Sequence, residues 1–99
     1  AHNAEYYFQE GGVAEAEGDP VRAAKAYARA VELEPRHAGA LFRLGFLNDL
    51  QGNDQDAIGY YEKCLKYPPV GKGVLYNLGI LYEDHDQYDK ATECYRRLH

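Results

Sequence analysis

The sequence lacks the features that mark several common classes of protein. No part of its 99 residues approaches the roughly 20 apolar residues in a row that a membrane-spanning helix needs. The opening stretch, residues 1–5, is neither basic nor apolar, so we expect no signal peptide. The net charge is −5, whereas nucleic-acid-binding surfaces are basic and clustered. We therefore expect neither a membrane nor a nucleic acid as a direct partner.

Cysteine is scarce, and the two cysteines stand alone. Cys64 and Cys94 belong to no CxxC or Cys/His spacing, so we predict neither a zinc site nor a thioredoxin-like redox motif. Free thiols fit a reducing compartment, and we expect a cytoplasmic protein. Cys64 occupies a small-residue position, equivalent to Ala30, and is predicted to be a buried, inert thiol.

The polar motifs that could carry chemistry have the wrong spacing for it. Gly71-Lys72-Gly73 lacks the upstream glycine and the following Ser or Thr of a phosphate-binding loop. In Asp84-His85-Asp86, consecutive helical side chains point in different directions, which favours a solvated helix end over a metal or acid–base cluster. Asn53-Asp54-Gln55-Asp56 lacks the glycine and the glutamate of a calcium loop. We predict no catalytic residue, no cofactor and no bound metal, and therefore no enzyme.

A repeat with a period of 34 residues is what the sequence does contain. Four kinds of residue keep this interval, namely Gly11, Gly45 and Gly79, Ala23, Ala57 and Ala91, Tyr27, Tyr61 and Tyr95, and Pro35 and Pro69. In the third unit, Leu75, Leu78 and Tyr82 fall on one stripe of a helix. The glycines would let a paired helix approach closely, at a helix-propensity cost of about 1 kcal/mol each.

This pattern resembles the tetratricopeptide repeat, in which Leu-Gly and Tyr are followed by Ala-x-x-x-aromatic and a closing Pro. The second unit matches it with Leu44-Gly45, Ala57, Tyr61 and Pro69. The resemblance implies an all-α fold, a right-handed superhelical stack (α-solenoid) of three helix–turn–helix repeats. We expect a single domain over residues 1–99, with repeats at about 4–37, 38–71 and 72–99.

The turn residues predict where the helices begin and end. Gly18 and Gly52 would end the first helices of their units, and Asp19 and Asn53 would cap the helices that follow. The expected helices are 4–17 and 20–33, 38–51 and 54–67, and 72–85 and 88–98. In the first unit Glu10 replaces the leucine of the stripe, which indicates a solvated end repeat. The alternative is a looser first helix that orders on binding.

The resemblance also implies a binding face, because the first helix of each pair lines the concave side, where partner peptides usually lie. Beside the core stripe, these helices repeat three rows: an aromatic row of Phe8, Phe42 and Tyr76, a small or apolar row of Gly12, Phe46 and Ile80, and an acidic row of Glu15, Asp49 and Glu83. The predicted partner-binding residues are Phe8, Glu15, Phe42, Arg43, Phe46, Asp49, Tyr76, Asn77, Ile80 and Glu83. For the aromatic row, packing between adjacent first helices is the alternative.

One specialisation of the family is not expected here. Chaperone-binding members grip a C-terminal carboxylate with Lys and Asn on the first unit, Asn on the second, and Lys and Arg on the third. The corresponding residues are Phe8 and Gly12, then Arg43, then Gly73 and Asn77. The carboxylate clamp is absent, so chaperone tails are not predicted partners.

We therefore expect a scaffold module that binds a protein or peptide segment with alternating basic and apolar character. A second hypothesis is self-association into homodimers or longer assemblies. It rests on the C-terminal end, where Tyr82, Tyr95 and Leu98 are expected to leave an apolar patch without a polar final helix.

A weaker resemblance concerns the third unit. Residues 74–84, with Tyr88-Asp89-Lys90-Ala91, are similar to the repeat portion of larger bacterial proteins. Those proteins continue into a domain similar to the C-terminal domain of the RNA polymerase alpha subunit. The resemblance implies a transcription-associated protein whose DNA contact lies outside this chain.

Overall fold

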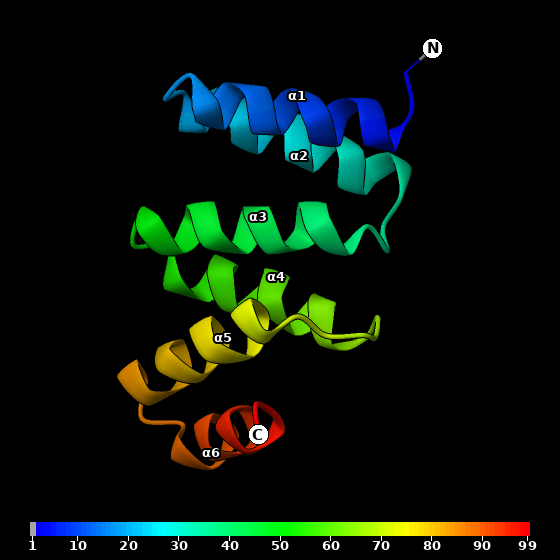
Figure 1. Ribbon diagram of the computed structural model, residues 1–99. Helices are drawn as coiled ribbons and strands as arrows, with labels where there is room; N and C mark the ends of the chain where they lie inside the picture. Colours follow the sequence, from blue (N-terminus) through cyan, green and yellow to red (C-terminus); the bar gives the residue numbers. More distant parts are fainter. Residues whose placement is uncertain (1) are drawn as a thin grey trace.

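The computed structural model describes residues 2–99, which form six α-helices arranged as three helical hairpins (Figure 1). The helices are α1 (Ala4–Ala16), α2 (Pro20–Leu33), α3 (Ala38–Leu50), α4 (Asp54–Leu65), α5 (Lys72–Asp84) and α6 (Tyr88–Arg97). Each expected helix begins at the predicted residue and ends within two residues of the predicted end.

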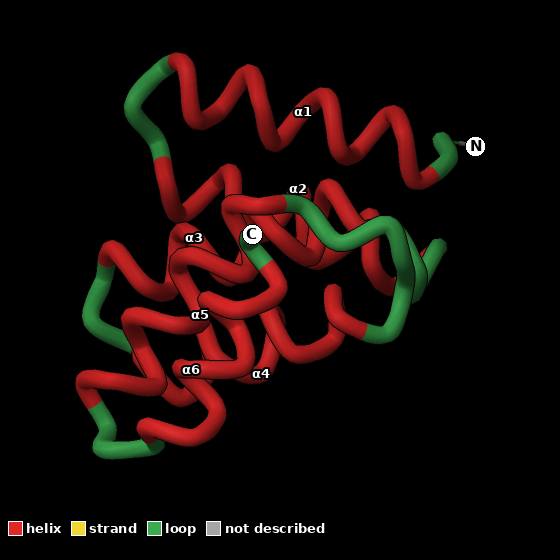
Figure 2. Tube along the Cα trace, turned by 60° about the horizontal axis from the view of Figure 1, so that its bottom comes forward, coloured by secondary structure: helices red, strands yellow, loops and turns green. Residues whose placement is uncertain are grey.

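The three hairpins stack one after another along the chain, so that α2 packs on α3 and α4 packs on α5. The stack is elongated, with principal extents of 44 × 26 × 19 Å. Over residues 2–99, Figure 2 shows helices and connecting loops and no strand. The predicted all-α solenoid is confirmed. None of these helices is both long and apolar enough to cross a lipid bilayer.

Each hairpin is closed by a glycine of its first helix that faces a tyrosine of its second. The pairs are Gly11 with Tyr27, Gly45 with Tyr61, and Gly79 with Tyr95. A Cβ atom added to any of the three glycines would lie 2.5–2.6 Å from a ring carbon of its tyrosine, well inside van der Waals contact. The repeated glycines are therefore required by the tyrosine rings, as their spacing predicts.

The turns between paired helices use a residue with positive φ. Gly18 and Gly52 have φ angles of +75° and +79°, a conformation that glycine adopts without the steric cost of a side chain. Asp86 takes the equivalent place in the third hairpin with φ of 62°. The predicted role of the glycines as helix terminators is confirmed.

The predicted helix caps are correct in one case and wrong in the other. The Asp19 side chain accepts a 3.0 Å hydrogen bond from the backbone N–H of Arg22 and so caps α2. Asn53 makes no such bond to α4. Its side-chain amide instead donates to Oδ1 of Asn48 at 3.4 Å, because the preceding helix offers a competing acceptor.

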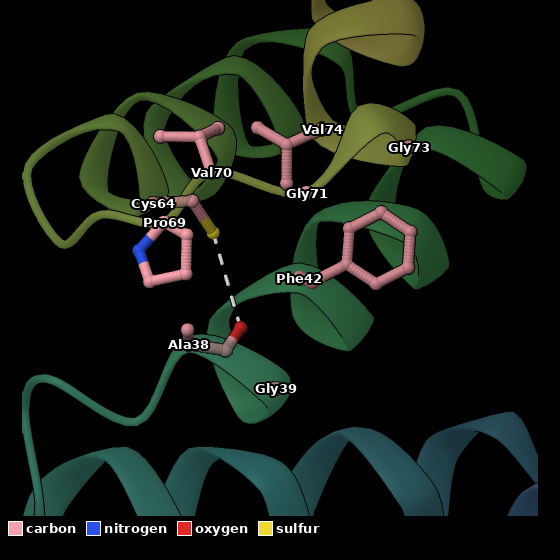
Figure 3. A pocket seen from close by; sticks show the side chains of 9 residues that line it. All are labelled: Ala38, Gly39, Phe42, Cys64, Pro69, Val70, Gly71, Gly73 and Val74. Atoms are coloured by element: carbon pink, nitrogen blue, oxygen red, sulfur yellow. Dashed lines mark hydrogen bonds between the residues drawn. The ribbon is translucent and has the colours of Figure 1, made fainter.

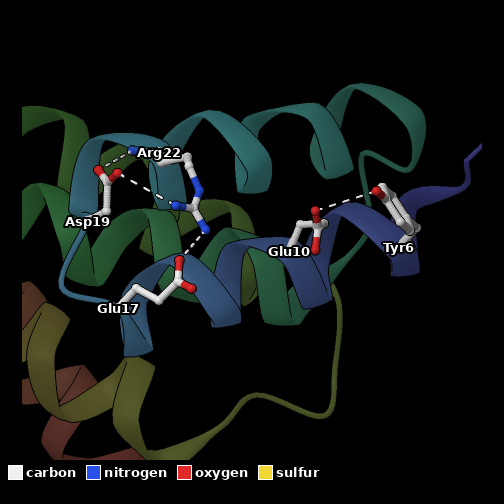
Figure 4. Close-up of polar contacts among 5 residues, drawn as sticks. All are labelled: Tyr6, Glu10, Glu17, Asp19 and Arg22. Carbon is white, nitrogen blue, oxygen red and sulfur yellow. Dashed lines mark hydrogen bonds and ion pairs between the residues drawn. The ribbon is translucent and has the colours of Figure 1, made fainter.

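The first hairpin is adapted to water on its outer side. Figure 4 shows that Glu10 is exposed and accepts a 3.4 Å hydrogen bond from the Tyr6 hydroxyl. Arg22 joins the two helices by donating to Glu17 at 2.5 Å. The solvated Glu10 agrees with the expected end repeat, and α1 is helical over its whole expected core from Ala4 to Ala16.

The expectation for the C-terminal end was wrong for Tyr82. This side chain is only 4% exposed, because it points back toward the preceding hairpin, where its hydroxyl donates to Glu62 of α4 at 2.5 Å. Tyr95 and Leu98 are partly buried. The large exposed apolar side chains of α5 are Tyr76 and Ile80, at 56% and 36%.

Candidate partner-binding groove

The aromatic row connects successive first helices. A Cβ atom added to Gly39 of α3 would lie 3.0 Å from Cζ of Phe8, and one added to Gly73 of α5 would lie 3.1 Å from Cζ of Phe42. The rings of both phenylalanines therefore rest on glycine backbone of the next hairpin. This contact is the packing role that we gave as the alternative for this row, and a ligand contact for either ring stays a prediction.

Tyr76 continues the same row but has no further hairpin beside it within residues 2–99. Its side chain is therefore largely exposed, in contrast to the half-buried rings of Phe8 and Phe42. Ile80 lies one turn further along α5 and is exposed as well. The two side chains form an apolar surface on the last first helix.

Two of the three acidic-row residues bind groups of the protein itself. Glu15 accepts a 2.5 Å hydrogen bond from the Tyr27 hydroxyl and a 2.9 Å bond from Nε of Arg43. The bond from Arg43 lowers the pKa of the Glu15 carboxyl, while burial, followed by the hydrogen bond to Glu15, raises the pKa of Tyr27 to about 12. Glu83 likewise accepts a hydrogen bond from the Tyr95 hydroxyl.

Asp49, the middle residue of the acidic row, makes no such bond. Its side chain is one methylene shorter than glutamate, and the hydroxyl of Tyr61 instead accepts a 3.3 Å bond from the Asn77 side chain. Partial burial raises the pKa of the Asp49 carboxyl, and the charges of Asp54 and Asp84 raise it further. Within residues 2–99 this carboxylate has neighbours of its own sign and no cationic partner.

Arg43 holds the positive charge of the groove in a fixed position. Its guanidinium group bonds Glu15 of α1 and lies 4.5 Å from the ring centroid of Phe46 and 5.8 Å from that of Phe42. The charge of Glu15 is thereby balanced inside the protein. The unbalanced charge of the groove is negative and is centred on Asp49 and Asp84, at the C-terminal ends of α3 and α5.

Sequence reasoning missed an apolar hollow of about 250 Å³ between the N-terminal ends of α3 and α5 (Figure 3). Its walls include Phe42, Cys64, Pro69, Val70, Gly71 and Val74. The only signal in the sequence is a difference between repeats, because Gly71 stands 34 residues after a histidine, His37.

Cys64 is buried in the wall of this hollow, with its sulfur 4.0 Å from the carbonyl oxygen of Ala38. Burial raises the pKa of its thiol to about 11, so the reactive thiolate is not formed near neutral pH. The prediction of a buried thiol is confirmed. Among residues 2–99, no three side chains of His, Cys, Asp or Glu come together as metal ligands would.

The predicted site residues therefore fall into three groups in the structure. Phe8, Glu15, Phe42, Arg43 and Phe46 are joined by packing and hydrogen bonds across α1 and α3, and Asn77 is tied to Tyr61. Tyr76 and Ile80 are exposed on α5. Asp49 and Glu83 are carboxylates near the C-terminal ends of their helices, and only Asp49 is without a bond.

Comparison with protein families gives a match over most of the chain. A sequence profile described as "Tetratricopeptide repeat" matches residues 8–70, and a second profile of the same description matches residues 73–98. Comparison with curated protein sequences gives no match.

Several solved structures share this fold. The crystal structure of MamA protein superposes with a TM-score of 0.84 at 27% identity, covering 97% of this chain and 52% of that one. A tetratricopeptide repeat protein from Parabacteroides merdae ATCC 43184 gives 0.84 at 26% identity, covering 96% and 38%. YrrB, described as a TPR protein with an unusual peptide-binding site, gives 0.81 at 23% identity, covering 99% and 50%, a likeness that shows the fold alone. The chain thus spans about half the length of these proteins or less.

Proposed function

Because the chain belongs to the tetratricopeptide repeat family, we propose that it binds a segment of another polypeptide in the groove formed by α1, α3 and α5. Proteins of this family are generally scaffolds without catalytic activity. The segment that fits this groove alternates between basic and apolar side chains.

The unpaired Asp49 carries this proposal. Its carboxylate is partly buried beside two other aspartates, an arrangement that costs free energy while no cation is near. A lysine or arginine of the partner would relieve that cost. The exposed side chains of Tyr76 and Ile80 on the neighbouring helix offer apolar surface to the residues that alternate with the basic ones. The printed description of YrrB shows that a protein of this fold can hold a peptide.

A titration of labelled peptides tests the proposal. We expect a peptide of alternating lysine and leucine to bind, and one of alternating glutamate and leucine not to bind. Asp49→Asn should weaken the lysine peptide about five- to tenfold at low salt, equivalent to about 1–1.4 kcal/mol for one partly buried charge. The weakening should shrink as salt screens the interaction.

The matched control is Asp56→Asn, which removes an exposed carboxylate from α4. It changes the net charge by the same amount but lies on a second helix, outside the groove. If both variants weaken binding equally, the attraction comes from net charge alone and the groove is not the site. Equal binding of the glutamate peptide would also contradict the proposal.

Three further elements belong to the same proposal. The groove has no carboxylate clamp, and it has no excess of positive charge that would attract a nucleic acid. Free cysteines, both buried, fit a cytoplasmic protein. The idea that the module serves a transcription-associated bacterial protein rests on the resemblance of residues 74–91 and gains no support from the relatives described above.

Self-association is a second proposal, and the exposed surface of α5 favours it. Tyr76 stands in register with two phenylalanines that each rest on a glycine of the next first helix. A second copy that covers Tyr76 and Ile80 would remove this apolar surface from water. We expect wild-type protein to dimerise as its concentration rises from micromolar to millimolar, and Tyr76→Lys to remain monomeric.

Sedimentation velocity measures this difference, and Tyr88→Lys is the control. Tyr88 is 60% exposed, but it lies on α6 rather than on the surface of α5. A wild-type protein that stays monomeric over the whole range would rule out the dimer, and dimer loss in both variants would place the contact elsewhere.

A further inference from the structure

The hollow between α3 and α5 has a counterpart between α1 and α3, and the counterpart is filled. His37 precedes α3 as Gly71 precedes α5, and each is the N-cap residue of its helix with an extended backbone. The ring of His37 lies 4.7 Å from that of Phe8, and its side chain is only 14% exposed. In the repeat register Phe8 corresponds to Phe42, which forms a wall of the open hollow.

The histidine ring is held by hydrogen bonds as well as by packing. Its Nδ1 atom accepts a 3.1 Å bond from the backbone N–H of Ala40 in the first turn of α3. Its Nε2 atom lies 3.3 Å from a carboxylate oxygen of Glu5. An aromatic ring with an acceptor directed at the helix N-terminus is therefore what this position accommodates.

The open hollow keeps the packing surfaces and loses the polar groups. Gly71 supplies no ring and no side-chain cap for α5. Gly39 replaces Glu5 and Val70 replaces Arg36 at the corresponding places. The occupant that fits is consequently more apolar than histidine, because a charged group there would lose its hydration against Val70 and Cys64 without gaining a partner.

We propose that this hollow binds an aromatic side chain of the polypeptide that occupies the groove. The ring would lie against Phe42 as His37 lies against Phe8. The backbone carbonyl beside it would accept from the uncapped N–H groups at the start of α5, taking the part of His37 Nδ1. The partial positive charge of the helix N-terminus, with Lys72 next to it, complements that carbonyl.

This inference rests on the proposed function and adds a spacing to it. The hollow adjoins Gly39 near the start of α3, whereas Asp49 is near its end, so the two are separated by about 15 Å along the helix. An extended segment would cover that distance with roughly four to five residues. The partner would thus carry an aromatic residue four to five positions from a basic one.

The test uses N-acetyl-phenylalaninamide as the probe and the amide NMR spectrum of the whole chain as the readout. We expect the probe to shift the signals of Val70, Gly71, Gly73 and Val74 with a millimolar dissociation constant, and N-acetyl-alaninamide to shift none of them. Gly71→His should weaken the probe at least tenfold, because it places in this hollow the ring that the first repeat already has. No atom lies within 4 Å of a Cβ added at this glycine, so the histidine fits.

Gly12→His is the matched control, because a Cβ atom added to Gly12 also meets nothing within 4 Å, and this glycine lies on α1 away from the hollow. It should leave probe binding unchanged. Probe shifts that cluster elsewhere in the wild-type spectrum, or that persist in Gly71→His, overturn the inference. The wild-type shift map decides the question even if the variant unfolds.

The two proposals fail separately in this design. Asp49→Asn should leave the probe's affinity unchanged, because the carboxylate is distant from the hollow. If the probe binds the hollow but the lysine–leucine peptide does not bind the protein, the groove proposal fails alone. If the peptide binds and the probe does not enter the hollow, only the present inference is lost.

Discussion

Replacement of Gly45 by alanine is expected to lower the free energy of unfolding by about 2 kcal/mol, although alanine is the better helix former. The added Cβ atom would lie 2.6 Å from Cε1 and 2.7 Å from Cδ1 of Tyr61. The Tyr61 ring is fully buried, so it cannot move aside without displacing its neighbours. An overpacking cost of about 3 kcal/mol outweighs the gain of about 1 kcal/mol from helix propensity.

The same substitution at Gly59 is expected to act in the opposite direction. Gly59 is inside α4, and no atom lies within 4 Å of a Cβ added to it. Gly59→Ala should therefore raise the free energy of unfolding by about 0.5–1 kcal/mol through helix propensity and the entropy of the unfolded chain.

Urea unfolding followed by far-ultraviolet circular dichroism measures both changes. If Gly45→Ala were as stable as the wild type, the close packing of the first and second helices of the middle hairpin would be wrong. A destabilising Gly59→Ala would show that the space beside α4 is smaller than described.

Raising the pH from about 9 to 12 is expected to remove about 4–5 kcal/mol of stability. Burial raises the pKa of Tyr27 and of Tyr61 to about 12 each, whereas an unfolded tyrosine titrates near 10. Between these values the unfolded chain releases protons that the folded protein retains, so stability falls as pH rises. Each tyrosine contributes about 2 kcal/mol of the loss at pH 12. The pKa of Tyr82 is raised in the same direction, mainly by burial.

Tyrosinate absorbance and circular dichroism, recorded on the same samples, check this expectation. Unfolding should accompany the ionisation of the buried tyrosines. Tyr61→Phe keeps the ring against Gly45 but removes one ionisable hydroxyl, so its stability should fall by about 2 kcal/mol less over the same range. A wild-type protein whose tyrosines all titrate near pH 10 while it remains folded would contradict the burial of these hydroxyls.

The repeat was sufficient to predict the fold because each hairpin obeys the same local rules. The interval between Gly45 and Gly79 identifies the close approach of paired helices, and Gly18 and Gly52 identify the turns. These features depend on residues near one another in sequence or in the repeat register. One chain was therefore enough to predict the helix boundaries within two residues.

Features that depend on competition between contacts were not predictable in this way. Asn53 has a good capping side chain, but Asn48 offers it another partner. Tyr82 belongs to the core because Glu62 of the preceding hairpin reaches its hydroxyl. The hollow became visible only when the space filled by His37 could be compared with the space beside Gly71.

The candidate groove was predicted by its chemistry but not by its pairing. The three rows were recognised from spacing, yet the sequence could not show that Glu15 is bound by Arg43 and Tyr27. Nor could it show that the rings of Phe8 and Phe42 rest on the next first helix. Such bonds connect different hairpins, and their geometry depends on how the hairpins stack.

The acidic row shows how duplicated units can diverge without a change of charge. Glu15 and Glu83 reach the tyrosine of their own hairpin, while Asp49, shorter by one carbon, does not. A single methylene thus decides whether a carboxylate serves as an internal strut or as a socket open to a visitor. Exchange of Asp and Glu along this row is a simple route by which evolution or a designer could move the binding position from one repeat to the next.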